Sequence, residues 1–324
     1  MRRFPERNIS KIMDENLKTI DGKPLSGIRL GVFGKGGAGK STVTVLLARA
    51  LADRGYDPVV LDADSTNVGL SGALGAGDGP RPLMDYFGGF AFMGGPVTCP
   101  VDDPTPLPDA DLDLDKLPQE FQSRTQPGIR VLVGGKLGEL GPGAGCDGPV
   151  AKIARDIRVR DTSGHPLFLA DFKAGFEDSA RGVILGLDWA LVVVDPTTAS
   201  LHMALHLDQM VKKLREGALP ATAHLEDPRL VEEARRQFRD SQVQGVAAIL
   251  NRVPDTETEA FIRERLQKMG GPQVLGVLPE NPAIQRQWLR GDEVRIQGVE
   301  ENMRSMILAL ENLTERSREP QPTG

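Results

Sequence analysis

The chain has 324 residues, of which 40% are apolar and 26% are charged, and this composition excludes disorder as the main state. Its formal net charge of −6 argues against a protein that coats nucleic acid, and two cysteines are too few for a disulfide framework. The sequence contains neither a run of 18 apolar residues nor an apolar stretch like that of a signal peptide near its start. We therefore expect a cytoplasmic protein that binds neither nucleic acid nor a membrane.

Composition predicts how the chain is organised. Residues 1–26 are expected to form an N-terminal extension, residues 27–316 a single domain and residues 317–324 a frayed C-terminal tail. An insertion at about residues 100–125 is acidic and rich in proline; from Asp102 to Glu120 it carries seven acidic residues against the single basic Lys116. We predict a solvated, partly extended loop there, with a partner-docking segment as the alternative.

Short apolar runs alternate with helical segments through the domain. Seven strands are predicted, near residues 28–33, 58–61, 129–133, 167–170, 189–194, 246–250 and 274–278. Each is apolar at consecutive positions, as in parallel strands that are buried on both faces. Helices are predicted near residues 40–54, 150–158, 201–216, 228–239, 256–269 and 299–312. The alternation predicts an α/β fold: a doubly wound, mostly parallel seven-stranded sheet with helices on both faces.

The strongest motif follows the first predicted strand and satisfies G-x-x-x-x-G-K-[ST]. It reads Gly34, Lys35, Gly36, Gly37, Ala38, Gly39, Lys40, Ser41 and Thr42. Glycines let successive backbone N–H groups point at a phosphate, and the helix that follows adds its positive N-terminal end. Lys40 is expected to reach the β- and γ-phosphates, and the Ser41 hydroxyl to bind Mg²⁺. The motif predicts a P-loop NTPase.

Carboxylates follow the second and fourth predicted strands, at the positions where a P-loop NTPase needs them. Asp62 and Asp64 come after the second strand, and Asp171 comes after the fourth. At the carboxyl ends of parallel strands beside the phosphate loop, such groups orient the attacking water or hold the metal. We predict Ser41, Asp62, Asp64 and Asp171 as magnesium ligands. Asp171 and Gly175 are predicted to form a switch that senses the γ-phosphate.

Three residues near the chain's later strands are candidates for holding the base. Asn251 and Arg252 end the sixth predicted strand, and Pro279 ends the seventh. The guanine-reading pattern N-K-x-D needs an aspartate three residues after the asparagine, and Pro254 stands there instead. Adenine is therefore favoured, and the expected nucleotide is ATP.

From residue 28 to about residue 313 the chain resembles the MinD/ParA/nitrogenase-iron-protein class of dimeric P-loop ATPases. Within that class it looks most like the CooC-type ATPases, which assist nickel insertion into carbon monoxide dehydrogenase. The resemblance is carried by residues 34–42, 62–67, 171–177, 194–201 and 276–281. It implies a homodimer that ATP closes and slow hydrolysis that a partner stimulates. In this class Lys35, the second lysine of the loop, reaches the partner's nucleotide, and Asp64 corresponds to the carboxylate that positions water. Lys35, Lys40 and Asp64 are thus the expected catalytic residues.

The chain departs from the CooC pattern at the metal site. CooC-type proteins carry Cys-x-Cys at the dimer interface; here Cys146 is present, and Gly148 stands at the second position. Across a two-fold axis Cys146 would supply two thiolates for Ni²⁺ or Zn²⁺, and Cys99 would supply two more if its loop folds back. The stretch also resembles the cluster-binding segment of nitrogenase iron proteins. Those proteins have a further cysteine that is missing between Asp171 and Asp188 here, so we do not expect a bridging iron–sulfur cluster.

Four functions remain open at this point, and the last two are a redox protein that passes electrons to a partner and an unrelated P-loop enzyme, such as a small-molecule ligase or a kinase. The first is a CooC-like ATPase that delivers metal to a client metalloenzyme, with Cys146 as ligand. The second is a ParA/MinD-like nucleotide switch that acts on a protein partner without metal, in which case Cys146 is an inert cysteine.

Overall fold

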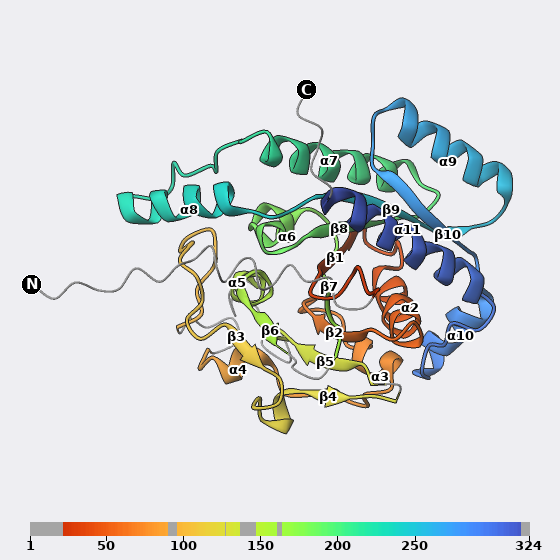
Figure 1. Cartoon of the computed structure of the whole chain (residues 1–324), viewed down its shortest axis with the longest axis horizontal. Coiled ribbons are helices and arrows are strands. Elements are labelled where there is room, and N and C mark those ends of the chain that lie inside the picture. The colour runs from red at the N-terminus through yellow and green to blue at the C-terminus, as the bar shows by residue number, and fades with distance from the viewer. Residues whose placement is uncertain (1–21, 90–95, 127, 137–146, 161–163, 319–324) are drawn as a thin grey trace, which may run out of the picture.

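The computed structural model describes residues 22–89, 96–126, 128–136, 147–160 and 164–318 (Figure 1). Its centre is an eight-stranded sheet in the order β10-β9-β8-β1-β7-β2-β5-β4. The parallel strands are β1 (Arg29–Gly34), β2 (Asp57–Asp62), β5 (Arg130–Val133), β7 (Pro166–Asp171), β8 (Trp189–Val194), β9 (Gly245–Val253) and β10 (Gln273–Pro279). They are the seven strands that the sequence predicts. The eighth, β4 (Ser123–Arg124), pairs antiparallel with β5 and was not predicted.

Helices cover both faces of the sheet, as predicted for a doubly wound fold. One face packs against α2 (Lys40–Asp53), α3 (Leu70–Leu74), α10 (Pro282–Arg290) and α11 (Glu300–Arg318). The other packs against α4 (Leu83–Tyr86), α5 (Gly148–Asp156), α7 (Thr198–Arg215) and α9 (Thr256–Lys268). Leu191 and Val193 of β8 enter the first core, while Val192 and Val194 enter the second. Because both faces are buried, the strand is apolar at every position.

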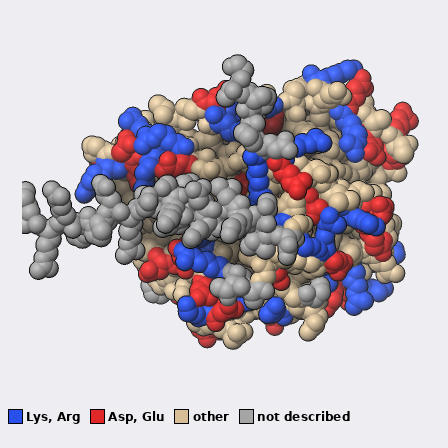
Figure 2. Space-filling view, viewed as in Figure 1, with Lys and Arg blue, Asp and Glu red and all other residues tan. Residues whose placement is uncertain are grey.

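The remaining elements are short or lie at the periphery. They are α6 (Glu177–Ala180), α8 (Pro228–Asp240), the 3₁₀ turns η1 (Gln119–Phe121) and η2 (Val183–Gly186), and a parallel pair of strands, β3 (Asp111–Asp113) and β6 (Arg158–Arg160). On the face shown in Figure 2, basic and acidic side chains are intermixed. No helix in the described part of the chain has the length and apolar character needed to cross a membrane.

The acidic insertion differs from its prediction. Its apolar side chains are buried in the main core beside α5 instead of being solvated: Leu107, Leu112, Leu114, Leu117 and Phe121. Leu112 in β3 and Leu114 just after it alternate with aspartates, so Leu112 packs inward while Asp111 is exposed. Charge and proline content mask this alternation, which is why composition alone gave the wrong expectation.

The C-terminal helix also extends further than expected. Helix α11 continues to Arg318, so the tail predicted to fray from residue 317 begins at the earliest after that residue. Its buried Glu311 accepts hydrogen bonds from Arg54 (2.8 and 2.5 Å) and from the Tyr56 hydroxyl (2.7 Å). These contacts fix α11 against the end of α2.

Candidate functional site

The phosphate loop joins β1 to α2, and residues at the end of β9 donate hydrogen bonds to it. Gly37 and Gly39 have φ angles of 80° and 92°, which favour glycine. A Cβ on Gly39 would lie 2.3 Å from the Asn251 amide nitrogen, so a side chain there has no room. Asn251 donates to the Ala38 carbonyl (2.8 Å), and Arg252 donates to the Gly37 carbonyl (2.8 Å). These two residues were predicted to read the base; in this structure their donors support the loop.

Lys40 and Ser41 begin α2 and meet Asp171 at the end of β7. The Lys40 side chain is buried; burial lowers its pKa, and the charges of Asp171 and Asp64 oppose that shift. Ser41 Oγ donates to Asp171 (2.6 Å), and Thr44 Oγ1 donates to its other carboxylate oxygen (3.2 Å). Burial raises the pKa of Asp171 to about 6, against the hydrogen bond from Ser41 and the charge of Lys40.

Asp62 ends β2 beside Asp171 and is almost completely buried. Burial raises its pKa to about 7, and the Asp171 and Asp64 charges add to that shift, while Lys136 opposes it. Lys136 lies 2.7 Å from Asp62 Oδ2, and Asp62 Oδ1 has no hydrogen-bond partner among the described residues. The Ser41 hydroxyl and two carboxylates, one of which has an unpartnered buried oxygen, form a hard oxygen donor set of the kind that Mg²⁺ prefers. The residues therefore fit a magnesium ion.

Lys136 follows β5 and was not identified from the sequence. Besides the ion pair with Asp62, its amino group donates to the Asp64 carbonyl (2.7 Å) and to the Asn67 carbonyl. It thus fixes the turn that carries Asp64. The Asp64 carboxylate itself accepts from the Thr66 backbone (2.9 Å) and the Thr66 hydroxyl (2.7 Å), which sets its orientation.

A cleft of about 390 Å³ unites most of the predicted nucleotide site. Of the predicted residues, Gly37, Gly39, Lys40, Ser41, Thr42, Asp64, Asn251, Arg252 and Pro279 line it. Gly34, Lys35, Gly36, Ala38, Asp62, Asp171 and Gly175 lie behind or beside it. Asn281 and Trp288, at the start and on the body of α10, also line the cleft and were missed. The sequence did contain a signal for helix α10, because an asparagine cap followed by proline, here Asn281 and Pro282, is a common helix start.

Two further predicted residues sit at the rim of the loop. Lys35 forms an ion pair with Asp195 at the end of β8 (3.0 Å), where the Lys35 side chain is one-third exposed. Burial raises the pKa of Asp195, but hydrogen bonds with Thr197, Ser200 and Lys35 outweigh burial and lower this pKa below its usual value. Gly175 has a φ of 94°, and its N–H donates to the Gly34 carbonyl (3.2 Å), which connects the predicted switch to the loop.

Of the two cysteines, Cys146 lies outside the described residues and Cys99 lies within them. Cys99 packs against the start of α5, because a Cβ on Gly148 would lie 2.6 Å from the Cys99 sulfur. Gly148 is two residues after Cys146 in the chain, so the Cys99 loop does fold back to this part of the molecule. In the described residues no group of three or more His, Cys, Asp or Glu side chains is arranged to hold a metal, so the magnesium site offers two carboxylates, Asp62 and Asp171, together with the Ser41 hydroxyl.

Comparison with curated proteins finds relatives that cover much of the chain. An uncharacterised ATP-binding protein of Methanocaldococcus jannaschii is 27% identical over 272 residues, which are 82% of this chain and 94% of the relative. The carbon monoxide dehydrogenase accessory protein CooC of Rhodospirillum rubrum is 29% identical over 191 residues, 58% of this chain and 70% of CooC.

Comparison with solved structures and family models gives the fold and the family. The septum site-determining protein MinD of Pyrococcus horikoshii, complexed with Mg-ADP, superposes with a TM-score of 0.53 at 20% identity, over 90% of this chain and 96% of MinD. At that identity the likeness shows a common fold. The model for the CobQ/CobB/MinD/ParA nucleotide binding domain matches residues 32–294, which contain the whole phosphate loop, the three buried or cleft-lining carboxylates and the predicted switch. The chain therefore belongs to the CobQ/CobB/MinD/ParA family of nucleotide-binding P-loop ATPases.

Proposed function

We propose that the chain is an ATP-driven dimerising ATPase that assists metal insertion, with nickel as the favoured metal, into a client metalloenzyme. The hydrolytic part of this proposal rests on the arrangement around Asp171. Loop N–H groups and Lys40 bind the phosphates of ATP, and Asp64, held in place by Thr66 and Lys136, orients the attacking water. Ser41, Asp62 and Asp171 would hold Mg²⁺, which when bound neutralises phosphate charge.

Lys35 provides the link between ATP and dimerisation in this proposal. Within one chain it is paired with Asp195 at the rim of the loop. Lys35 is one-third exposed whereas Asp195 is buried, and Asp195 keeps the hydrogen bond from the Thr197 hydroxyl when Lys35 leaves, so Lys35 can exchange Asp195 for the nucleotide of a second chain. Slow hydrolysis that the client stimulates then follows from a catalytic site that is complete only in the closed dimer.

The metal-handling part is carried by the contact between Cys99 and Gly148. It brings the Cys99 sulfur against Gly148, which is two residues after Cys146 in the sequence, and we propose that the two thiols act at one site. A dimer closed about this region would present two thiolates from each chain, a soft donor set that suits Ni²⁺ or Zn²⁺. Similarity to CooC supports the same assignment.

The test is metal content per dimer. Anaerobic protein is offered Ni²⁺ or Zn²⁺ with and without a non-hydrolysable ATP analogue, and bound metal is measured after gel filtration. We expect about one metal per dimer, lost in Cys146→Ser and reduced in Cys99→Ser. His202→Asn, at an exposed position on α7, is the control and should retain the metal. Unchanged metal in Cys146→Ser would refute the thiolate role.

A nucleotide switch without metal is the second candidate, and the Lys35–Asp195 pair favours it equally well. In that case the ATP-closed dimer itself is the signal that a protein partner recognises. No metal in any nucleotide state, together with an ATP-dependent dimer that Lys35→Ala abolishes, would establish the switch in place of metal delivery.

A further inference from the structure

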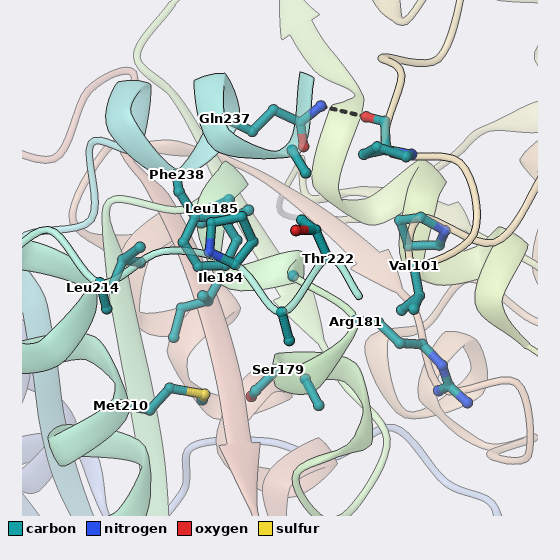
Figure 3. Close-up of a pocket in the computed structure, with 18 of the residues that line it drawn as sticks. Val101, Ser179, Arg181, Ile184, Leu185, Met210, Leu214, Thr222, Gln237 and Phe238 are labelled. Atoms are coloured by element: carbon teal, nitrogen blue, oxygen red, sulfur yellow. Dashed lines mark hydrogen bonds between the residues drawn. The ribbon is translucent and has the colours of Figure 1, made fainter. Parts of the chain in front are cut away.

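A second cavity, of about 700 Å³, lies apart from the nucleotide cleft and shares no lining residue with it (Figure 3). Its walls come from α7, α8, the segment from Ser179 to Leu185 and the loop at Pro100 and Val101. Apolar side chains form most of the interior: Ile184, Leu185, Met210, Leu214, Leu225 and Phe238. The volume falls within the range of sites that hold small organic ligands.

Specific hydrogen bonds hold the walls of the cavity together. The His224 ring lies 2.9 Å from the Val101 carbonyl, and Gln237 of α8 donates to the Pro104 carbonyl, the dashed line in Figure 3. Arg155 donates in turn to the Gln237 side chain (2.9 Å). Helix α8 is thereby tied across the cavity, although Ala234 is its single buried residue among those described. The apolar face of α8 covers a space that no described side chain fills.

One buried polar group faces this space without a partner. Ser179 is 3% exposed, and its hydroxyl has no hydrogen-bond partner among the described residues. In Figure 3 the hydroxyl is directed to the side on which Met210 lies. A buried hydroxyl without a partner is unfavourable, so a ligand atom that bonds to Ser179 Oγ would satisfy it.

The charges around the cavity have one sign. Its described lining includes Arg155, Arg181, Lys213, His206 and His224 but no aspartate or glutamate. Both arginines are engaged elsewhere: Arg155 with Asp156, and Arg181 with acidic residues that include Asp147. Figure 3 shows the Arg181 guanidinium directed away from the cavity, so its stem is what lines the wall.

Lys213 is different, because it is exposed and forms no ion pair within the described part of the chain. It lies one turn from Met210 on the same face of α7. An ammonium group at the opening of an apolar cavity is suited to hold the carboxylate of a ligand whose body is buried.

We propose that this cavity binds a small amphiphilic acid, with its carboxylate at Lys213, an apolar chain among the aliphatic side chains, and a polar substituent on that chain that bonds to Ser179 Oγ. Dodecanoate is the probe that carries the carboxylate and the chain. The cavity wall from Ser179 to Leu185 comes shortly after the switch residue Gly175 in the chain. The proposed binding site does not depend on the proposed metal site.

The experiment is isothermal titration of the full chain with dodecanoate, kept below its micelle concentration, and with dodecylamine as the probe of opposite charge. We expect one dodecanoate per chain and at least tenfold weaker binding of dodecylamine. Lys213→Ala should weaken dodecanoate binding at least fivefold, whereas Arg215→Ala, which removes a nearby exposed cation outside the lining, should leave it within twofold.

Met210→Trp fills the interior and should abolish binding in protein whose circular dichroism is unchanged. Because Lys213 is exposed, its variant tests the proposal even where Met210→Trp does not fold. Equal binding of the two probes, or equal effects of Lys213→Ala and Arg215→Ala, would overturn the proposal.

Discussion

The contact that attaches the acidic insertion to α5 gives the sharpest prediction for stability. Lys152 of α5 is 2% exposed, and its amino group donates to Thr98 Oγ1 (2.8 Å), the Asp103 carbonyl (3.0 Å) and the Asp103 carboxylate (3.0 Å). Asp103→Ala removes the counter-charge of a buried cation and leaves it uncompensated.

The magnitude follows from the burial of the two partners. Removing one member of a buried ion pair costs about 3–5 kcal/mol. The Asp103 side chain is 31% exposed, so water reaches the site and we expect a loss of about 2–3 kcal/mol in the free energy of unfolding. Lys152→Met removes the buried charge itself and should cost about 1 kcal/mol, because the remaining carboxylate can be hydrated. The double variant should therefore be more stable than the sum of the two losses predicts.

The assay is urea unfolding at pH 7, with Asp102→Ala, an exposed neighbour, as the control within about 0.5 kcal/mol of the parent. Burial raises the pKa of Asp103, but hydrogen bonds from Thr105, Thr98 and Lys152 outweigh burial and lower this pKa below its usual value. The stability that this carboxylate adds is therefore complete above its unfolded pKa of about 3.9 and lost as the pH falls below it. A deficit below 0.5 kcal/mol in Asp103→Ala at pH 7, or one that grows on acidification, would refute the reasoning.

Three predictions concern the nucleotide cleft. Lys40→Ala should abolish MgATP binding, measured by equilibrium dialysis, because it removes the buried cation beside the phosphate loop. Asp64→Ala should retain MgATP and form a lasting dimer on gel filtration, with phosphate release reduced at least about 100-fold; normal turnover would remove Asp64 from catalysis. Trp288 lines the cleft whereas the buried Trp189 lies in β8, so the fluorescence change on adding ADP should vanish in Trp288→Phe and persist in Trp189→Phe.

The sequence predicted those features that local pattern determines. Consecutive apolar residues located all seven parallel strands, because both faces of six of them are buried and both faces of the edge strand β10 are partly covered. The phosphate loop was found because its glycines and lysine are adjacent in the chain and satisfy a strict spacing. The cap-and-proline start of α10 was equally local and was overlooked, since the helix is short and lies mostly at the surface.

Other features depend on contacts between distant parts of the chain. Lys136 reaches the turn at Asp64 from the end of another strand, and no nearby motif marks it. The packing of Cys99 on Gly148 and the pairing of Lys35 with Asp195 are likewise set by the sheet order. In the insertion, a strongly acidic composition outweighed the weaker signal of alternating leucines. The roles of such residues can be recognised only from the folded structure.

The strand order has a consequence for how the chain is made. Strand β1, which leads into the phosphate loop, precedes the other described strands in the chain, yet its neighbours in the sheet are β7 and β8. At ordinary translation rates these neighbours leave the ribosome on the order of ten seconds later. Until then the apolar residues of β1 have no partner strand, and the glycine-rich loop has no framework to hold its curve. During that interval an apolar strand lacks both of its neighbours, and the phosphate loop acquires its final curve only after β8 has been translated.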